Sequence, residues 1–494
     1  MTVGIDAPLG TLPEHTATQL YLAGQWQDAS DGGTFTDINP STEKPLADIA
    51  SATVDDVDAA VRAARAQLCG EWGATPGSVR GKLLNRIADL IDRDAALLSR
   101  LEALDVGTPV SQAAMLPIPN ASATFRHFAG WADKINGATI PTDGYFGTST
   151  FSYTVREPVG VIGAIIPWNS PLLIAGWKLA PALAAGNTLV VKPAEDAPLS
   201  VLHLARLIEE AGVPAGVVNV LPGLGAVTGA AIVGHPDVDK ISFTGSPEVG
   251  RIIGQRAAAT LKRTTLELGG KSPHVIMADA DMEAAINGIA MGLFSNQGQI
   301  CAAGTRVLVH RSVYSEVVAG LLEAAAAQVL GDPVDPNTTM GALVSARQRD
   351  RVLGYIQAGR DAGARLVAGG GRPEGAGFFV EPTIFADVDT DSKIAQEEIF
   401  GPVGSVIPFD TFEQAVTLAN GTAYGLSASV WTHDVSFAHH LAAQIRVGSV
   451  WVNAWGVFDP ALPWGGMKTS GVGRELGRAG IEANTEEKVV TIVL

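Results

Sequence analysis

The spacing of hydrophobic positions changes near residue 158 of the chain. Before that point, apolar residues recur at helical spacing, which predicts helices over 54–67, 78–104 and 120–134. The stretch 145–156 alternates apolar and polar residues instead, which predicts an edge or arm strand. We therefore expect the first 150 or so residues to be mostly helical and to end in one strand.

From residue 158 onward, short apolar runs alternate with helical segments. The pattern predicts four strand–helix units, with strands at 159–166, 188–192, 217–221 and 240–243 and helices at 171–185, 199–211, 226–233 and 247–259. Strands that are apolar throughout are typical of a parallel sheet with helices on both faces. A sheet of this kind binds its ligands at the carboxyl ends of its strands.

A second strand–helix series runs from about residue 264 to residue 450 and predicts a second α/β domain. Its clearest elements are strands at 307–310 and 404–409 and helices at 313–329 and 412–420. The tail over 486–494 ends in an apolar strand, which needs a pairing partner because its edges would otherwise be open.

Composition narrows the class of protein. A chain of 494 residues fits about three domains, and a net charge of −17 disfavours nucleic acid or an anionic membrane as the main partner. Two cysteines, Cys69 and Cys301, are too few for a disulfide framework, which fits a reducing compartment. No apolar stretch is long enough to cross a bilayer, and the N-terminus resembles neither a secretory signal nor a transit peptide. We expect a cytoplasmic globular protein.

Several familiar motifs are incomplete or absent. The glycines at 223, 225 and 229 follow a strand, but the third is one position too late for the dinucleotide fingerprint. No Gly-x-Ser-x-Gly sequence occurs, which disfavours a serine hydrolase of that type. The nine histidines show no metal-ligand spacing, so we expect no metal.

Cys301 is the candidate nucleophile. It follows a helical stretch on a segment loosened by Gly298 and Gly304, where backbone amides lie close and a substrate has room to approach. Burial statistics alone would make a single cysteine a small core residue. Polar residues that follow the predicted strands favour the catalytic interpretation instead.

Two of these strand ends suit a dinucleotide. Ser246 and Pro247 begin a helix after Gly245, where free amides would hold a pyrophosphate; an ordinary capped helix is the alternative. Lys192 and Glu195 suit ribose hydroxyls, and the carboxylate would repel the 2′-phosphate of NADP; a surface ion pair is the alternative.

Two other strand ends suit catalysis beside a thiol. The side-chain amide of Asn169 could donate to an oxyanion, although such a residue is by default a turn or cap residue. Glu267 could activate water, although it could instead pair with Lys271 or a neighbouring amide.

Together these segments resemble the NAD(P)-dependent aldehyde dehydrogenase superfamily, over essentially the whole chain. The resemblance rests on seven motifs in the family's order and spacing: Pro-Trp-Asn at 167–169, Lys-Pro-Ala-Glu at 192–195, Phe-Thr-Gly-Ser at 243–246, Glu-Leu-Gly-Gly-Lys at 267–271, Gly-Gln-Ile-Cys at 298–301, Glu-Glu-Ile-Phe-Gly-Pro at 397–402 and Gly-Gly-Met-Lys-Thr-Ser-Gly at 465–471.

The resemblance implies an α/β fold with a Rossmann-like parallel-sheet NAD-binding domain over 1–136 and 158–263 and a second α/β catalytic domain over 264–470. It also implies a small β oligomerisation arm formed by 137–157 and 471–494, and hence a homodimer or homotetramer.

The resemblance also assigns roles to individual residues. Cys301 would attack the aldehyde as a thiolate, Asn169 and the backbone N–H of Cys301 would hold the oxyanion, and Glu267 would activate the water that hydrolyses the thioester. Lys178 and Glu475 would form a proton path. NAD, in preference to NADP, would be bound by Ile165, Trp168, Lys192, Glu195, Gly225, Gly229, Phe243, Gly245, Ser246, Leu268, Glu398 and Phe400.

A tunnel would lead the aldehyde to Cys301, lined by Ser170, Ile174, Trp177, Ile300, Trp455 and Phe458. Ser170 stands where many relatives carry a large apolar residue, which indicates a wider tunnel or one more polar contact. No lysine or arginine is present among these residues to anchor a second carboxylate. We expect the substrate to be a neutral, fairly bulky alkyl, aryl or terpenoid-like aldehyde, oxidised to the carboxylic acid.

Three alternatives stay open at this stage. A betaine-type or other amino-aldehyde could bind against the tryptophans of the tunnel through cation–π contacts. A cysteine esterase could use the same thiol, amide and carboxylate without a nicotinamide. A non-catalytic homologue could keep the fold alone.

Overall fold

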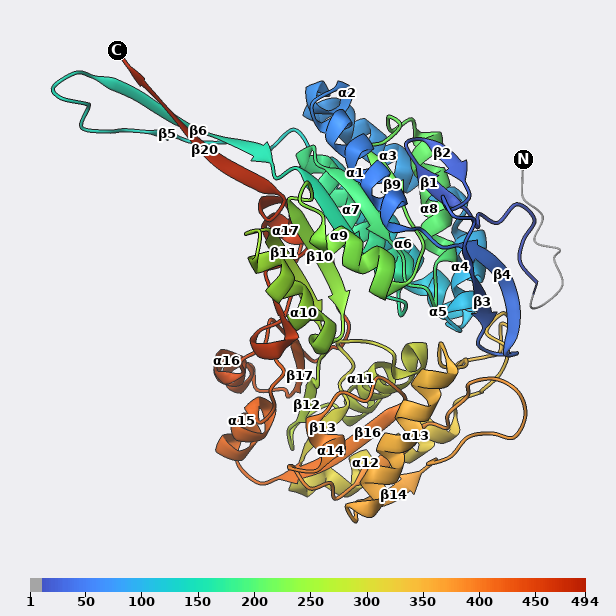
Figure 1. Ribbon diagram of the computed structural model, residues 1–494. Coiled ribbons are helices and arrows are strands. Elements are labelled where there is room, and N and C mark those ends of the chain that lie inside the picture. Colours follow the sequence, from blue (N-terminus) through green and yellow to red (C-terminus); the bar gives the residue numbers. More distant parts are fainter. Residues whose placement is uncertain (1–10) are drawn as a thin grey trace.

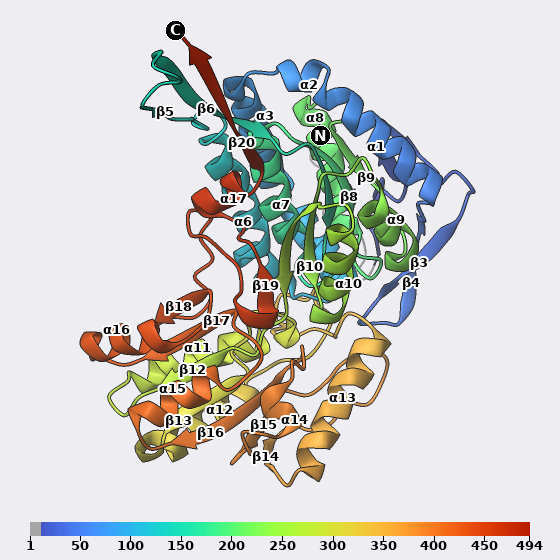
Figure 2. The same cartoon turned by 60° about the vertical axis from the view of Figure 1, so that its left-hand side comes forward.

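The computed structural model describes residues 11–494, which form two large sheets and an arm that projects from the body (Figure 1). Residues 1–10, part of the N-terminus and of the expected cofactor domain, lie outside the described residues. The tip of the arm lies beyond the body in the turned view as well (Figure 2).

The first sheet has eight strands in the order β19-β11-β10-β7-β8-β9-β1-β2. The five strands from β11 to β9 run parallel, whereas β19 and β1 join them antiparallel. The strands are β1 (Leu20–Leu22), β2 (Gln25–Gln27), β7 (Val161–Ile165), β8 (Thr188–Lys192), β9 (Val218–Val220), β10 (Lys240–Gly245), β11 (Arg263–Leu268) and β19 (Gly471–Val472).

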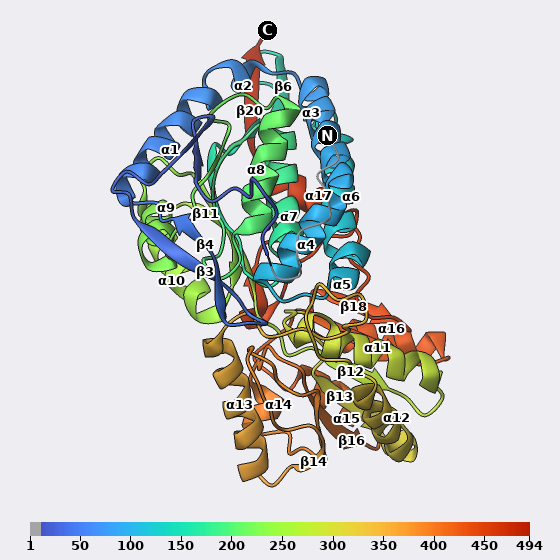
Figure 3. The same ribbon diagram turned by 90° about the vertical axis from the view of Figure 1, so that its right-hand side faces the viewer.

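Helices cover both faces of this sheet because its central strands are apolar on both faces. Along β8, Leu189 and Val191 pack with the core beneath one set of helices, whereas Val190 packs with the core on the other face. The first set contains α3 (Gly77–Arg93), α4 (Ala95–Asp105), α6 (Pro117–Ala129), α7 (Pro171–Ala185) and α8 (Leu199–Ala211). The second contains α1 (Val54–Leu68), α9 (Ala230–Gly234) and α10 (Pro247–Ala258), which lie apart from α3 and α6 in Figure 3.

The second sheet has seven strands in the order β14-β15-β16-β13-β12-β17-β18, all parallel except β14. Its strands are β12 (Pro273–Ile276), β13 (Arg306–His310), β14 (Arg365–Ala368), β15 (Thr383–Ala386), β16 (Val403–Phe409), β17 (Ser427–Trp431) and β18 (Ser449–Val452). Its helices are α11 (Met282–Phe294), α12 (Tyr314–Ala326), α13 (Ala346–Asp361), α14 (Lys393–Gln396), α15 (Phe412–Asn420) and α16 (Val435–Gln444). The two sheets confirm the expected α/β class.

The arm is a three-stranded sheet in the order β20-β6-β5. The terminal strand β20 (Thr485–Val493) pairs antiparallel along the whole of β6 (Thr150–Pro158), and β5 (Thr139–Ile140) adds a short third strand. The tail strand therefore has the pairing partner that the sequence required, and it follows the short helix α17 (Gly477–Glu482).

The structure corrects three sequence expectations. The helix expected over 78–104 is broken at Asp94, which leaves helical geometry and binds His203 (2.8 Å) and Arg93 (2.7 Å). The mostly helical N-terminal region also holds four short strands, β1, β2, β3 (Thr34–Asn39) and β4 (Lys44–Ala50), and two short helices, α2 (Glu71–Ala74) and α5 (Val110–Met115). Finally, β11 pairs with β10, so the second sheet begins at β12 rather than near residue 264. The division of the chain into domains stays a prediction.

Candidate active site

The carboxyl ends of neighbouring parallel strands bring the sequence motifs into one row. Gly245 of β10 lies beside Leu268 of β11, and Ile165 of β7 lies between Phe243 and Lys192 of its two neighbours. Strands in a sheet are about 4.8 Å apart, so the row from β11 to β8 spans about 14 Å. Motifs separated by up to 100 or so residues in the chain thus share one edge of the sheet.

Cys301 lies where two cavities meet. A cavity of about 570 Å³ follows the sheet edge, and a narrower one of about 100 Å³ runs between the helical layer and the loops of the second sheet. Both are lined by Asn169 and Cys301, and Glu267 lines the larger one. The thiol, the amide and the carboxylate predicted to react therefore lie together.

The loop before Cys301 has an unusual backbone. After α11 ends at Phe294, the residues Asn296, Gln297 and Gly298 all adopt left-handed conformations, with φ values of 47°, 57° and 70°. A Cβ on Gly298 would lie 2.3 Å from the carbonyl oxygen of Gly401, so only glycine fits there. The three residues turn the chain sharply and place Cys301 at the junction of the cavities.

The Cys301 thiol is a weak acid in this environment. Burial raises its pKa to about 12, and the carboxylates of Glu398 and Glu267 add to the rise. Hydrogen bonds from the backbone amides of Ala302 and Cys301 act in the opposite direction. At neutral pH the thiol is therefore protonated, and its reaction requires a base or a change in local charge.

Asn169 is placed to donate to an oxyanion. It lies in the loop between β7 and α7, and its Nδ2 donates to the backbone oxygen of Gln299 at 2.9 Å. A side-chain amide carries two N–H groups, so the second is available to the substrate beside Cys301.

Glu267 is a buried carboxyl group at the end of β11. Within residues 11–494, neither of its oxygens has a hydrogen-bond partner, and the residue is 4% exposed. Burial raises its pKa well above the ordinary value, and the negative charge of Glu475 adds to the rise. A carboxyl group with a raised pKa beside a reactive atom is typical of a general acid or base.

The two residues expected to form a proton path are in contact. Lys178 of α7 donates to Glu475 Oε1 at 2.6 Å, and both side chains are buried. Ser242 of β10 completes the group, because its hydroxyl lies 3.2 Å from Lys178 Nζ and donates to Glu475 at 3.0 Å. Sequence reasoning missed Ser242, which occupies an ordinary position within an apolar strand.

Six of the expected cofactor residues line the larger cavity near Cys301, and Glu398 is the ionisable one among them. The other five are Trp168, Gly245, Ser246, Leu268 and Phe400. Burial raises the pKa of Glu398 to about 7, although the amide of Gly270 donates to its carboxylate at 2.9 Å and acts against the rise. The rings of Trp168 and Phe400 meet edge to face at 5.1 Å.

The hydroxyl of Ser246 has a structural use. It accepts a hydrogen bond from the backbone N–H of Val249 at 3.2 Å and so caps α10. Ser246 therefore caps the helix, as the alternative interpretation predicted. It also lines the larger cavity, and its cofactor role stays a prediction.

The expected ribose-binding pair, Lys192 and Glu195, forms a separate cluster along the same sheet edge. Lys192 Nζ donates to Glu195 Oε2 at 2.9 Å, and the amide of Gly225 donates to Glu195 Oε1 at 3.3 Å. A Cβ on Gly229 would lie 3.5 Å from the side chain of Lys192. These four residues, together with Ile165 and Phe243, do not line the larger cavity.

Sequence reasoning assigned no role to several residues of the larger cavity, among them Thr244 and three arginines. The hydroxyl of Thr244 is buried and has no hydrogen-bond partner within residues 11–494. Three exposed arginines, Arg251, Arg347 and Arg351, stand on the wall of the cavity. Exposed arginines are common on any surface, so no sequence pattern indicates that these three share a site.

The residues along this row fit NAD. The positive charges of Arg251, Arg347 and Arg351 suit a pyrophosphate. The carboxylates of Glu195 and Glu398 suit the hydroxyls of the two riboses of NAD. The Thr244 hydroxyl has no partner within residues 11–494 and can still form a hydrogen bond. A Cβ on Gly269 would lie 2.0 Å from Glu398 Oε2, so this carboxylate needs glycine beside it to reach its place.

All six expected tunnel residues line the narrower cavity. Sequence reasoning missed others, among them Met115, Leu173, Met291 and Trp464. No aspartate, glutamate, lysine or arginine lines this cavity. The indole N–H groups of Trp177 and Trp455 donate to Asn120 Oδ1 (2.8 Å) and Ala302 O (3.1 Å), so the tryptophans offer apolar surface to a ligand.

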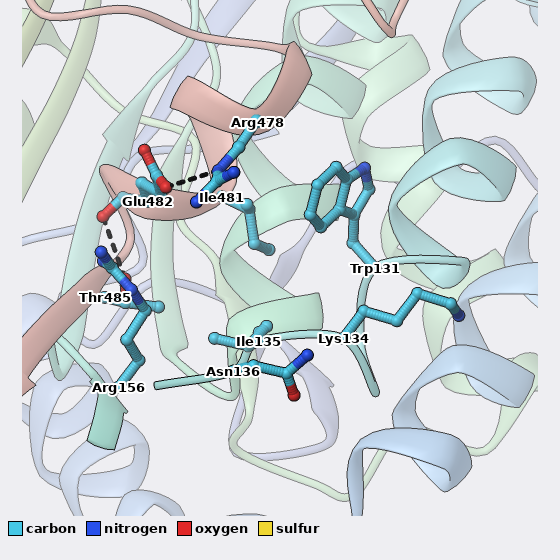
Figure 4. A pocket seen from close by; sticks show the side chains of 9 residues that line it. All are labelled: Trp131, Lys134, Ile135, Asn136, Arg156, Arg478, Ile481, Glu482 and Thr485. Carbon is cyan, nitrogen blue, oxygen red and sulfur yellow. Dashed lines mark hydrogen bonds and ion pairs between the residues drawn. The ribbon is translucent and has the colours of Figure 1, made fainter. Parts of the chain in front are cut away.

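Another small cavity, of about 180 Å³, lies at the root of the arm (Figure 4). Its charged groups are paired: Arg478 binds Glu482 at 2.7 Å, and Arg156 donates to Thr485 at 3.2 Å and to Glu487 at 2.9 Å. In the part of the chain that the structure describes, no group of acidic, histidine or cysteine residues is arranged to hold a metal ion, and no helix has the length and apolar character needed to cross a membrane.

Comparison with known proteins gives consistent matches. The sequence model of the aldehyde dehydrogenase family matches residues 26–490. The mitochondrial aldehyde dehydrogenase of Homo sapiens is 48% identical over 494 residues, which cover 99% of this chain and 95% of that protein. The NAD⁺ complex of an aldehyde dehydrogenase from Bacillus cereus superposes with a TM-score of 0.94 at 46% identity, covering 97% and 96% of the two chains. A betaine aldehyde dehydrogenase from Staphylococcus aureus superposes with a TM-score of 0.94 at 38% identity, covering 97% and 98%.

Proposed function

The chain belongs to the aldehyde dehydrogenase family, and on this premise we propose that it oxidises aldehydes to carboxylic acids through a thioester on Cys301, with NAD as cofactor. The observation that carries the proposal is the junction of the two cavities, where Cys301, Asn169 and Glu267 lie together. One cavity holds the aldehyde and the other holds the nicotinamide end of the cofactor.

The first half of the reaction takes place at Cys301. Its thiol gives its proton to a water molecule, and Sγ bonds to the aldehyde carbon, whose oxygen becomes an oxyanion. Nδ2 of Asn169 and the backbone N–H of Cys301 hold this oxyanion. When bound, NAD accepts the hydride that leaves the substrate carbon, and the acyl group stays on Cys301 as a thioester.

The second half releases the acid. Glu267 takes a proton from a water molecule as the oxygen of that water attacks the thioester carbon; the carbon–sulfur bond breaks and frees Cys301. The raised pKa of Glu267 makes it a strong enough base when it is ionised. The buried group of Lys178, Ser242 and Glu475 offers a path for the proton towards solvent.

The cofactor residues favour NAD over NADP. Lys192 and Glu195 would bind the hydroxyls of the adenosine ribose, and a 2′-phosphate there would meet the Glu195 carboxylate. Arg251, Arg347 and Arg351 would bind the pyrophosphate, and Glu398 the nicotinamide ribose.

The substrate that fits the tunnel is a neutral aldehyde with a bulky alkyl, aryl or terpenoid-like group. The support is the absence of charged side chains from its lining and the four large rings that meet there: Trp177, Trp455, Phe458 and Trp464. A betaine-type aldehyde is the second candidate, because such rings also stabilise a quaternary ammonium group.

A panel of aldehydes tests this assignment through NADH absorbance. We expect kcat/KM for benzaldehyde and octanal to exceed that for succinic semialdehyde by about 100-fold or more, because an unpaired carboxylate would have to enter an apolar tunnel. Replacing NAD with NADP should lower kcat/KM by about tenfold or more, because of charge repulsion at Glu195. Betaine aldehyde as the best substrate would support the second candidate, and ester cleavage without NAD reduction for any aldehyde would support the esterase.

The arm supports a homodimer or homotetramer. Strand β20 lies at the edge of the arm sheet and β18 at the edge of the second sheet, so both have open backbone groups. Val489, Ile492, Val493 and Leu494 of the arm are exposed. A second copy of the chain would cover these apolar groups if its sheet were extended by the arm.

Charge on the arm should break this assembly. Val489→Asp combined with Ile492→Asp is expected to shift the mass measured by light scattering from an oligomer to a monomer, because two carboxylates would be buried in the contact. Leu261→Asp, which changes a residue that is 91% exposed on the body, is the matched control and should stay oligomeric. An unchanged mass for the arm variant would exclude this interface.

A further inference from the structure

Asn296 is linked to the oxyanion donor by a direct hydrogen bond. Its side chain is buried, and Nδ2 donates to the backbone oxygen of Asn169 at 2.7 Å and to that of Gln299 at 3.3 Å. The same Gln299 oxygen accepts the hydrogen bond from Asn169 Nδ2. Asn296 therefore contacts the backbone of Asn169 and the carbonyl oxygen that accepts the hydrogen bond from the Asn169 amide.

The orientation of Asn296 is set from another part of the chain. Between α4 and α5, Thr108 donates from its hydroxyl to Asn296 Oδ1 at 2.6 Å. Turning the amide over would place its oxygen against two carbonyl oxygens and its nitrogen against the Thr108 hydroxyl. Thr108, which is 3% exposed, thus directs the two N–H groups of Asn296 towards Asn169 and Gln299.

The backbone of Asn296 is also held from outside its own loop. The backbone N–H of Asn296 donates to Gln112 Oε1 at 2.8 Å. The side-chain Nε2 of the next residue, Gln297, donates to the backbone oxygens of Gly107 (3.2 Å) and Ala342 (2.9 Å). Left-handed backbone is costly for residues other than glycine and persists where the surroundings fix it. These bonds fix two such residues directly upstream of Cys301.

We propose that Asn296, oriented by Thr108, is a positioning residue that holds Asn169 in the geometry required of the oxyanion donor. The proposal rests on the function proposed above. Asn296 and Thr108 also line the narrower cavity, but neither is the expected donor to the oxyanion. A donor displaced by about 1 Å can cost about 100-fold in rate, so a residue that only positions the donor can still control turnover.

The Thr108→Val variant tests the proposal, with Thr108→Ser as the matched control. Valine removes the hydroxyl and keeps the shape, so we expect kcat/KM for aldehyde oxidation to fall about tenfold; serine should restore it to within about threefold. The rate at which iodoacetamide alkylates Cys301 should change less than twofold, because alkylation forms no oxyanion. Equal losses in oxidation and alkylation would mean that Thr108 supports the loop as a whole, and this would overturn the proposal.

Asn296→Gly provides a second variant that suits the left-handed backbone. It removes the amide, so we expect a loss in kcat approaching the ~10²–10³-fold expected for Asn169→Ala. In the Asn169→Ala background, neither Thr108→Val nor Asn296→Gly should cause more than a twofold further loss. Fully additive losses would contradict the proposal. Failure of the unaltered enzyme to oxidise any aldehyde would instead defeat the function on which it rests.

Discussion

Replacing Cys301 with serine should lower aldehyde oxidation by about 10⁴-fold or more and leave NAD binding within about twofold of its original strength. The serine hydroxyl keeps the size of the side chain but is a far weaker nucleophile than a thiolate. Turnover is measured by NADH absorbance, and NAD binding by quenching of tryptophan fluorescence.

The second cysteine provides the control for this experiment. Cys69 is exposed at the end of α1, away from both cavities, so Cys69→Ser should retain normal turnover. Normal turnover by Cys301→Ser would remove the nucleophile from the mechanism. Absence of turnover in the unaltered chain, with NAD still bound, would favour the non-catalytic homologue.

Replacing Glu267 with glutamine should separate the two halves of the reaction. Acylation of Cys301 continues, so we expect a burst of NADH close to one equivalent per active site. Steady-state turnover should then fall by about 10²–10⁴-fold, because the water has lost its base. Stopped-flow absorbance measures both the burst and the steady rate.

The pH dependence follows from the raised pKa of Glu267. The carboxyl group acts as a base only when ionised, and burial shifts its ionisation to higher pH. Hydrolysis of the thioester should therefore speed up as the pH rises through this pKa and slow down below it. The glutamine variant should lose that dependence, and a similar slope in both enzymes would assign the base to another group.

Much of the fold could be predicted from hydrophobic spacing. The helices α7, α8 and α15 and the strand β8 begin and end where the sequence indicated, because each is a continuous apolar or periodic run, and the helices α7 and α8 end at glycines, Gly186 and Gly212. The strands near the N-terminus were missed because they are short and partly polar and depend on pairing with distant strands such as β9.

The residues of the candidate site could be predicted because parallel strands bring them to one edge of the sheet. Residues at the carboxyl ends of neighbouring parallel strands must lie at one edge, so Asn169, Glu267 and Lys192 could be placed together from topology. The network around Asn296 could not, because Thr108 and Gln112 come from a turn and a short helix with no periodic signal. The tunnel residues Met115 and Met291 were missed because methionine is an ordinary core residue.

The subcellular location stays a prediction. The sequence favours the cytoplasm, whereas the human relative is named as a mitochondrial enzyme. Catalytic chemistry at Cys301 does not depend on the compartment as long as the thiol stays reduced.

In the proposed mechanism, Cys301 carries the acyl group of the substrate. Mass spectrometry of the Glu267→Gln enzyme, quenched after mixing with NAD and benzaldehyde, tests it directly. We expect the peptide containing Cys301 to gain the mass of the aldehyde less two hydrogen atoms, and no other peptide to gain it. An unmodified Cys301 peptide after a full burst of NADH, or an acyl group on a different residue, would contradict it.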